Sequence, residues 1–229
     1  MYGEDLAHIH EAGFAGDAEA AARVLARELP RPARVVDLGC GGGTLAAALS
    51  AAGHAVWGCD ASPAMVELAR RRAPRARFEV ADVLGVAIPG CDAVACVGEV
   101  LNYALAGRPL AAADNIFARV HAALPRDAPF LLDVATTAQP QGARFARREG
   151  DGWAVEAHSV VAGDSLLRTI ESRRLVTGRE RRGVEVHRQR LLDAQWVLER
   201  LEACGFRALE LDGYGHPFPA GRRAFLAHA

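Results

Sequence analysis

The chain has 229 residues, about half of them hydrophobic, and a formal net charge of −1. This length suits one α/β core with a modest insertion, so we interpret residues 1–229 as a single domain. The charge disfavours nucleic acid as a partner, because neutralising phosphates requires a basic surface. No apolar run reaches the ~20 residues of a membrane span and no signal peptide opens the chain, so we expect a cytoplasmic protein without a membrane partner.

The first third of the chain alternates between helical and strand patterns. Residues 17–29 combine good helix formers with helical apolar spacing, and we interpret residues 1–30 as an N-terminal helical cap that carries His8 and His10. A strand over 33–38, a glycine cluster and a helix over 44–52 follow, and a second strand over 55–59 leads to a helix over 64–72. Ser62 and Pro63 suit the cap and the first position of that helix.

The rest of the chain supplies the remaining strands and helices of this core and one insertion between them. Strands are expected over 77–81, 92–97 and 129–135, with a helix over 111–124. Residues 138–192 contain three alternating segments without a helix between them, which predicts an antiparallel β insertion after the fifth strand. A helix over 194–204 and strands over 206–211 and 223–227 close the chain. The expected fold class is α/β, with a doubly wound, mostly parallel sheet.

Cysteine and basic residues limit the chemistry further. The five cysteines are scattered, without the spacing of a zinc site or a disulfide framework, so we expect reduced thiols and no metal site. All basic residues are arginines, which excludes lysine-based covalent catalysis. Arginines exceed acids between 144 and 190, a pattern that suits a solvated sheet face and, less well, an anionic small substrate.

The glycine cluster between the first strand and the following helix is the strongest signal. Gly39, Gly41 and Gly43 would let the backbone approach a ligand closely. Gly41, Gly43 and Ala46 also satisfy the spacing G-x-G-x-x-A of dinucleotide enzymes. Asp37, at the end of the strand, argues against a pyrophosphate there and would tolerate a ligand with a cationic amino-acid end.

With these residues the sequence resembles the class I S-adenosylmethionine-dependent methyltransferases, whose first motif pairs an acid with alternating glycines. The resemblance implies a Rossmann-like, seven-stranded sheet and S-adenosylmethionine as cofactor. It also implies that Asp60 binds the ribose, that Met65 packs on the adenine, and that Asp82 recognises the adenine. The implied cofactor-binding residues are Tyr2, Asp37, Gly39, Cys40, Gly41, Gly43, Asp60, Ala61, Met65, Asp82, Val83 and Gly98.

The sequence gives fewer signals for the residues that would contact the methyl acceptor. Residues 98–103 follow the fourth strand, where ligands of open α/β sheets bind, and Glu99 is the best local candidate for a general base. His187 on the insertion is the second catalytic candidate, with Glu185 and Arg190 near it. This insertion resembles that of bacterial small-molecule methyltransferases, including amino-sugar N-methyltransferases. Residues 98–101 depart from the motif of enzymes that methylate nucleic-acid amines.

Each candidate residue also has a structural interpretation. Asp60 and Asp82 could be turn residues, Met65 could be core, and Glu99 could favour a helix dipole. The sequence therefore favours a methyltransferase that acts on a small-molecule acceptor and could form a homodimer. A nicotinamide-dependent oxidoreductase and a non-catalytic, cofactor-binding regulator are the alternatives.

Overall fold

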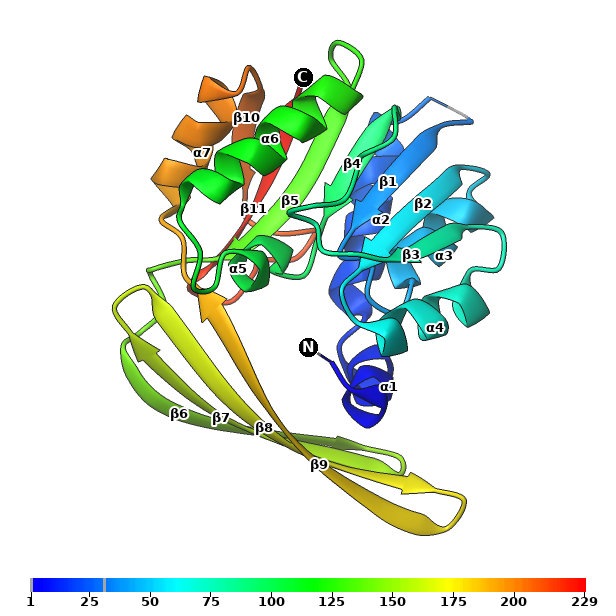
Figure 1. Cartoon of the computed structure of the whole chain (residues 1–229), viewed down its shortest axis with the longest axis vertical. Coiled ribbons are helices and arrows are strands. Elements are labelled where there is room, and N and C mark those ends of the chain that lie inside the picture. Colours follow the sequence, from blue (N-terminus) through cyan, green and yellow to red (C-terminus); the bar gives the residue numbers. More distant parts are fainter. Residues whose placement is uncertain (1, 31) are drawn as a thin grey trace.

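A computed structural model of the chain describes residues 2–30 and 32–229 and contains two sheets (Figure 1). In the larger sheet β1 to β5 run parallel, β11 is antiparallel to β5, and β10 is antiparallel to β11. The expected α/β fold with a mostly parallel, seven-stranded sheet is thereby confirmed. Its strands, in spatial order, are β10(Arg207–Leu211), β11(Arg222–His228), β5(Pro129–Ala135), β4(Ala93–Cys96), β1(Arg34–Leu38), β2(Ala55–Asp60) and β3(Arg77–Val80).

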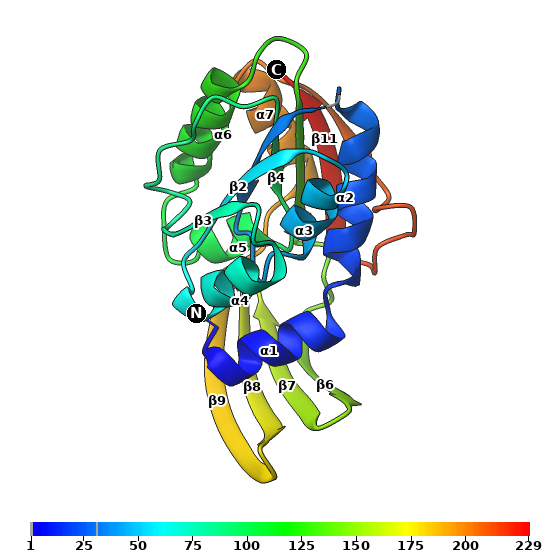
Figure 2. The same ribbon diagram turned by 90° about the vertical axis from the view of Figure 1, so that its right-hand side faces the viewer.

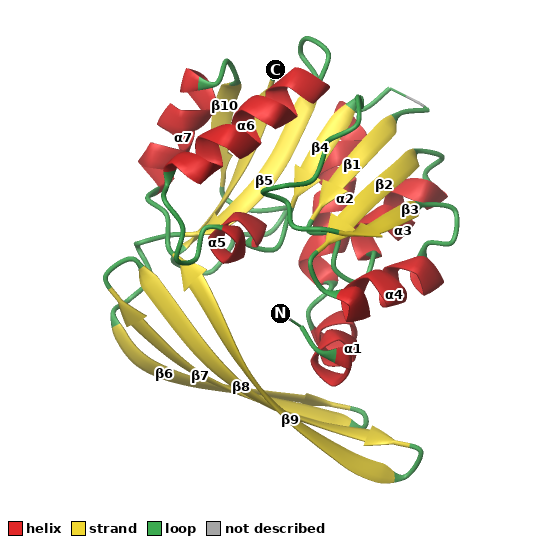
Figure 3. Cartoon of the chain, in the orientation of Figure 1, coloured by secondary structure: helices red, strands yellow, loops and turns green. Residues whose placement is uncertain are grey.

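Helices cover both faces of this sheet, because its central strands are apolar on both sides. Along β1, Val35 belongs to the hydrophobic cluster beneath α2(Gly16–Glu28) and α3(Thr44–Ala51), whereas Val36 belongs to the cluster beneath α6(Ala111–Ala123) and α7(Ala194–Ala203). Neighbouring residues of a strand point to opposite faces, so one short apolar strand serves two cores. Figure 3 shows the resulting helix, sheet and helix layers.

Two shorter connections frame the carboxyl ends of the parallel strands. Between β2 and β3, α4(Pro63–Arg72) begins at Ser62, whose hydroxyl accepts a hydrogen bond from the Met65 amide at 3.2 Å. After β4, the single-turn helix α5(Val100–Ala104) begins at Glu99, which adopts a left-handed backbone conformation with φ 61°. Both helices therefore start at the edge of the sheet where ligands of this fold class bind.

The insertion forms the second sheet, which has four antiparallel strands rather than the three expected: β6(Gly142–Gly150), β7(Trp153–Ala162), β8(Ser165–Val176) and β9(Arg179–Arg190). The sequence did not reveal β6 because every residue of this strand is exposed, which leaves no polar and apolar alternation. Strand β9 begins at Arg179, directly after the tight turn that follows β8. The turn itself is confined to Thr177 and Gly178, which both have positive φ.

An additional helix, α1(Glu4–Gly13), lies between the core and the insertion (Figures 1 and 2). Leu6 and Ile9 on this helix form a small hydrophobic cluster with Val155 and Ile170 of the insertion. Ion pairs of Asp5 with Arg174 and Arg181 reinforce the contact. Helix α1 therefore packs against the insertion, whereas α2 covers one face of the larger sheet. Among the helices of the described residues, none is long and apolar enough to cross a membrane.

Candidate active site

A cavity of about 1120 Å³ lies between the carboxyl edge of the parallel strands, α1 and the concave face of the insertion. The core contributes the glycine-rich loop after β1, the ends of β2 and β4, and the start of α5. The insertion contributes side chains from all four of its strands. Most of the predicted site residues line this cavity: Tyr2, Gly39, Cys40, Gly41, Asp60, Ala61, Met65, Asp82, Val83, Gly98, Glu99 and His187.

The glycine-rich loop takes a shape that only glycine tolerates at several positions. Gly39 has φ 74°, and a Cβ atom there would lie 2.3 Å from a methyl carbon of Val100. Gly43 has φ 80° but does not line the cavity, because its Cα faces Ala69 of α4, where a Cβ would lie 2.8 Å from the Ala69 Cα atom. Gly39 therefore brings the loop close to α5, and Gly43 brings α3 close to α4.

Asp60, at the end of β2, ties this loop to the next helix. Its carboxylate accepts hydrogen bonds from the amides of Gly41, at 3.1 Å, and Ser62, at 2.8 Å. Burial raises the pKa of Asp60, and the two amide donors oppose this change. Each carboxylate oxygen has a further lone pair, so the group could still accept hydrogen bonds from a ligand in the cavity.

Asp37 lies behind the loop and is 2 % exposed, and unlike most of the predicted cofactor-binding residues it does not line the cavity. One of its carboxylate oxygens, Oδ2, has no hydrogen-bond partner among the described residues. Burial and the negative charges of Asp60 and Glu11 raise the pKa of Asp37 to about 7. A buried, uncompensated acid is costly, so this position would be stabilised by a ligand that brings positive charge.

The residues expected around an adenine lie together at one end of the cavity. Met65 is buried on α4, and Val83 is buried in the connection after β3. The half-exposed side chain of Asp82 accepts a hydrogen bond from the Leu84 amide and pairs with Arg108 at 3.2 Å. These contacts leave Asp82 free to accept from a ligand amine with its remaining lone pairs.

The N-terminal segment crosses the cavity from the core to the insertion. The Tyr2 carbonyl accepts a hydrogen bond from the Ser62 hydroxyl at 2.7 Å, and the Gly3 amide donates to Glu185 at 3.0 Å. Further along, the Glu11 carboxylate accepts from the Gly42 amide at 3.2 Å and the Thr44 hydroxyl at 2.8 Å. Glu11 thus connects α1 to the glycine-rich loop. No pattern in the sequence marked this acid.

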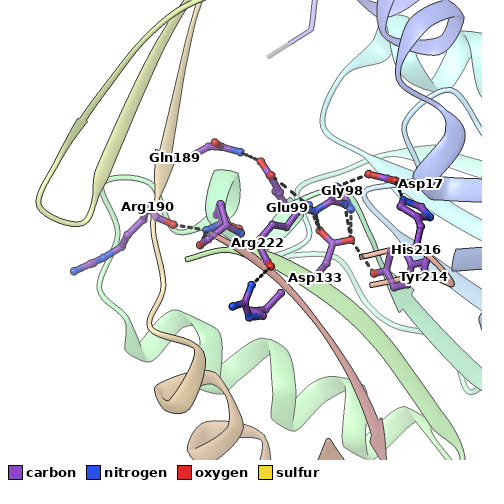
Figure 4. Close-up of polar contacts among 12 residues, drawn as sticks. Asp17, Gly98, Glu99, Asp133, Gln189, Arg190, Tyr214, His216 and Arg222 are labelled. Atoms are coloured by element: carbon purple, nitrogen blue, oxygen red, sulfur yellow. Dashed lines mark hydrogen bonds and ion pairs between the residues drawn. The ribbon is translucent and has the colours of Figure 1, made fainter. Parts of the chain in front are cut away.

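A buried polar network holds the loop that carries Glu99 (Figure 4). Asp133 of β5 is fully buried and accepts hydrogen bonds from the Gly98 amide at 3.0 Å, the Glu99 amide at 2.8 Å and the Tyr214 hydroxyl at 2.8 Å. Arg222 of β11 pairs with Asp133 at 3.1 Å. Because Asp133 holds both amides, it fixes the left-handed backbone of Glu99 and the direction of that side chain.

The Glu99 carboxylate itself reaches toward the insertion. Its Oε2 atom accepts a hydrogen bond from Gln189 of β9 at 2.7 Å, and Oε1 lies 3.9 Å from Arg222. The neighbouring Asn102 side chain is buried and bonds to the Ala135 amide and carbonyl and to the Arg190 carbonyl. These contacts join α5, β5 and the end of β9, which places Glu99 where the core and the insertion meet.

His187 of β9 lies opposite Glu99 on the wall formed by the insertion. It is 3 % exposed, and its Nε2 atom lies 3.0 Å from Glu185. Its Nδ1 atom has no hydrogen-bond partner among the described residues. The ring meets those of Tyr2 and Tyr103 edge-on, with centroid separations of 4.7 and 5.8 Å. Burial lowers the pKa of His187, which favours the neutral imidazole.

Arg190 was considered with His187, but it does not line the cavity. Its guanidinium pairs with Asp164 and donates to the Arg108 carbonyl, so it anchors the end of the insertion. Tyr103 belongs to the segment 98–103 that the sequence placed near the ligand, and it lines the cavity. The sequence did not identify Arg168 or Arg222 as site residues, although both line the cavity as well. Arg168 and Arg222 lie far apart in the sequence, and only the fold brings both to the cavity.

A family model and a curated relative both match part of this chain to methyltransferases. Residues 35–124 match the methyltransferase domain family. Over 66 residues the chain is 53 % identical to a trans-aconitate 2-methyltransferase of Methylobacterium nodulans, and this match spans 28 % of the chain and 26 % of that protein. The chain therefore matches about a quarter of the length of this curated relative.

Solved structures match over nearly the whole chain. A S-adenosylmethionine-dependent methyltransferase from Clostridium acetobutylicum is 18 % identical with a TM-score of 0.81, covering 97 % of this chain and 96 % of the other. A S-adenosylmethionine-bound amino pentose methyltransferase of calicheamicin biosynthesis, from Micromonospora echinaspora, is 21 % identical with a TM-score of 0.77, covering 100 % and 97 %. At this identity the likeness concerns the fold, including the antiparallel insertion.

Proposed function

We propose that the chain is a class I S-adenosylmethionine-dependent methyltransferase that transfers the methyl group of S-adenosylmethionine to a small-molecule acceptor, in agreement with the match of residues 35–124 to the methyltransferase domain family. The observation that supports this most is the unpartnered carboxylate oxygen of Asp37 behind the glycine-rich loop. A cationic ligand would compensate this buried acid, whereas the pyrophosphate of a nicotinamide cofactor would add a second negative charge.

The residues present fit S-adenosylmethionine along the core side of the cavity. The ammonium group of its amino-acid end would lie near Asp37 and the glycine-rich loop, Asp60 would accept hydrogen bonds from the ribose, and Met65 would pack on the adenine. Asp82 and Val83 complete the adenine end, and Tyr2 and Gly98 flank the middle of the cavity. Five acids line the core side, from α1 to α5, which suits a cofactor that carries a sulfonium charge: Glu11, Asp17, Asp60, Asp82 and Glu99.

When bound, the cofactor supplies a methyl group already activated by its sulfonium, so the chemistry asks the protein mainly for alignment. The fixed loop of Gly98 and Glu99 and the wall of the insertion would hold the acceptor atom in line with the methyl group. The acceptor lone pair forms the new bond to carbon as the carbon–sulfur bond breaks, and the acceptor loses a proton. We assign that proton to His187, with its Nδ1 atom as the base.

Glu185 supports His187 in this role. If the Nε2 atom donates to the Glu185 carboxylate, the lone pair of the imidazole lies on Nδ1, which has no partner among the described residues. A carboxylate that fixes the tautomer and stabilises the protonated ring is the arrangement used by catalytic histidines elsewhere. Glu99 is held by Gln189 and Arg222, so we assign it to orienting the acceptor as a hydrogen-bond acceptor.

The relatives support a small molecule as the acceptor. Their names specify trans-aconitate and an amino pentose, two small polar metabolites. We propose the same general class here, with neither nucleic acid nor membrane as a partner. The scattered, unpaired cysteines support a reducing compartment such as the cytoplasm. Formation of a homodimer stays a prediction.

Incubation of the protein with S-adenosylmethionine and a metabolite mixture tests the proposal, with mass detection of products that gain one methylene and of S-adenosylhomocysteine. Methylated product should form with wild type and fall about 10²- to 10⁴-fold in His187→Ala, which loses the base but keeps the cofactor side. Tight cofactor binding with no product from any mixture would favour the regulator alternative. Failure of S-adenosylmethionine to bind would refute the proposal.

A further inference from the structure

The charged residues that line the cavity are unevenly distributed between its two walls, although the core also contributes Arg108 and Arg222. All five acids belong to the core and α1, whereas five arginines and no acid come from the described residues of the insertion. The five arginines of this basic wall are Arg144, Arg147, Arg148, Arg168 and Arg188. The register places Arg144, Arg148 and Arg168 on the same face of the insertion as His187, whereas Arg147 and Arg188 lie on the other face. The acidic wall suits the cationic cofactor, so the first three arginines face the acceptor side.

Most of these arginines already have partners. Arg147 pairs with Glu149 and Glu156 at 2.8 and 2.7 Å. Arg148 lies over the Phe14 ring, 4.7 Å from its centroid, and Arg144 donates to the Pro140 carbonyl. Within residues 2–30 and 32–229, the guanidinium groups of Arg168 and Arg188 form neither an ion pair nor a hydrogen bond. Of these two, Arg188 is exposed and Arg168 is half-buried.

Arg168 is the deeper of the two and lies among the residues proposed for catalysis. It stands opposite His187 in the pairing of β8 with β9. Burial raises the pKa of Tyr103, and the charge of Arg168 is the strongest influence in the opposite direction. Around Arg168 the lining of β7 and β8 is largely apolar, with Val155, Ala157 and Ile170. A guanidinium in such surroundings attracts an anion strongly.

We propose that the methyl acceptor carries an anionic group, a carboxylate or a phosphate, and that Arg168 binds it. This inference rests on the proposed function, because it takes the basic wall as the acceptor side. It explains why the insertion places an unpaired arginine beside His187. The guanidinium can form two parallel hydrogen bonds with either anion, which would fix the acceptor relative to the base.

The test uses the protein loaded with S-adenosylhomocysteine and two probes, citrate and inorganic pyrophosphate, titrated by calorimetry. Both anions should bind to the wild-type complex, and Arg168→Gln should weaken this binding about 10- to 100-fold, as expected for a lost charge-assisted hydrogen bond. Arg168→Lys should restore part of the affinity. The matched control Arg179→Gln removes the same charge from the exposed start of β9, outside the cavity, and should have little effect. The tighter probe identifies the anionic group as carboxylate or phosphate.

Several results would overturn the inference. Equal anion binding by wild type and Arg168→Gln, or equal losses in Arg168→Gln and Arg179→Gln, would show that Arg168 forms no specific site. The absence of binding by either probe to the wild-type complex would show that there is no anion site. A loss of S-adenosylhomocysteine affinity in folded Arg168→Gln and Arg168→Lys would assign the arginine to the cofactor carboxylate. Failure of wild type to bind S-adenosylhomocysteine would instead refute the proposed function.

Discussion

Replacing Asp37 by asparagine tests the buried acid behind the glycine-rich loop. The pKa of Asp37 rises from its ordinary value of 3.8 to about 7 through burial and the nearby charges of Asp60 and Glu11. One pKa unit corresponds to about 1.36 kcal/mol, so ionising Asp37 in the folded, ligand-free protein costs about 4 kcal/mol. The folded state holds this proton up to pH ~7, whereas the unfolded state releases it near pH ~4.

The sign of the pH dependence follows from this difference. Between these two pH values the folded state binds more protons than the unfolded state, so the Asp37 contribution to stability is present at low pH and lost as the pH rises through 7. Asparagine cannot ionise. Relative to Asp37→Asn, the wild-type free energy of unfolding should therefore fall by about 3 kcal/mol between pH 5 and pH 8.

Urea unfolding of ligand-free wild type and Asp37→Asn at pH 5 and pH 8 measures this change. Asp92→Asn is the control, because a hydrogen bond from the Arg34 amide lowers the pKa of Asp92; this carboxyl is ionised in both states at pH 5 and pH 8, so its variant should differ from wild type by the same amount at both pH values. A difference between wild type and Asp37→Asn that is the same at both pH values would refute the reasoning. In addition, S-adenosylhomocysteine should bind wild type more tightly at pH 8 than at pH 6 and bind Asp37→Asn without this dependence.

Three further substitutions separate cofactor binding, catalysis and loop positioning. Asp60→Ala should weaken S-adenosylhomocysteine binding by about 1.5–3 kcal/mol, and unchanged affinity in a folded variant would reject its ribose role. His187→Ala should lower turnover of an identified acceptor while calorimetry finds the S-adenosylhomocysteine affinity unchanged; full activity would exclude it as the base. Asp133→Asn should lower the free energy of unfolding in urea by about 3 kcal/mol, because Arg222 loses a buried counter-charge, and an unchanged value would contradict its role in fixing Glu99.

The parallel core could be predicted from the sequence because its signals are local. Val35 and Val36 form a short buried strand, the glycines after them require positive φ, and Ser62 and Pro63 mark a helix start. Each of these signals arises within a few residues. The cofactor side of the candidate site follows from the same signals, because it lies at the ends of consecutive strands.

The acceptor side could be predicted only in part, because it depends on contacts between distant segments. His187 was a candidate, but nothing in the sequence showed that Tyr2 would meet its ring or that Arg168 would lie opposite it. Strand β6 is exposed along its whole length and therefore lacks an alternating pattern. Asp133 did leave a signal, since an acid within an otherwise apolar buried strand needs a partner, but only the fold identifies that partner as Arg222.

Calorimetric titration of the purified protein with S-adenosylhomocysteine and, separately, with NAD and NADP tests the central claim most directly. We predict that wild type binds S-adenosylhomocysteine, that Asp60→Ala binds it more weakly, and that neither NAD nor NADP binds. Binding of NAD or NADP, with no heat from S-adenosylhomocysteine or S-adenosylmethionine, would contradict it.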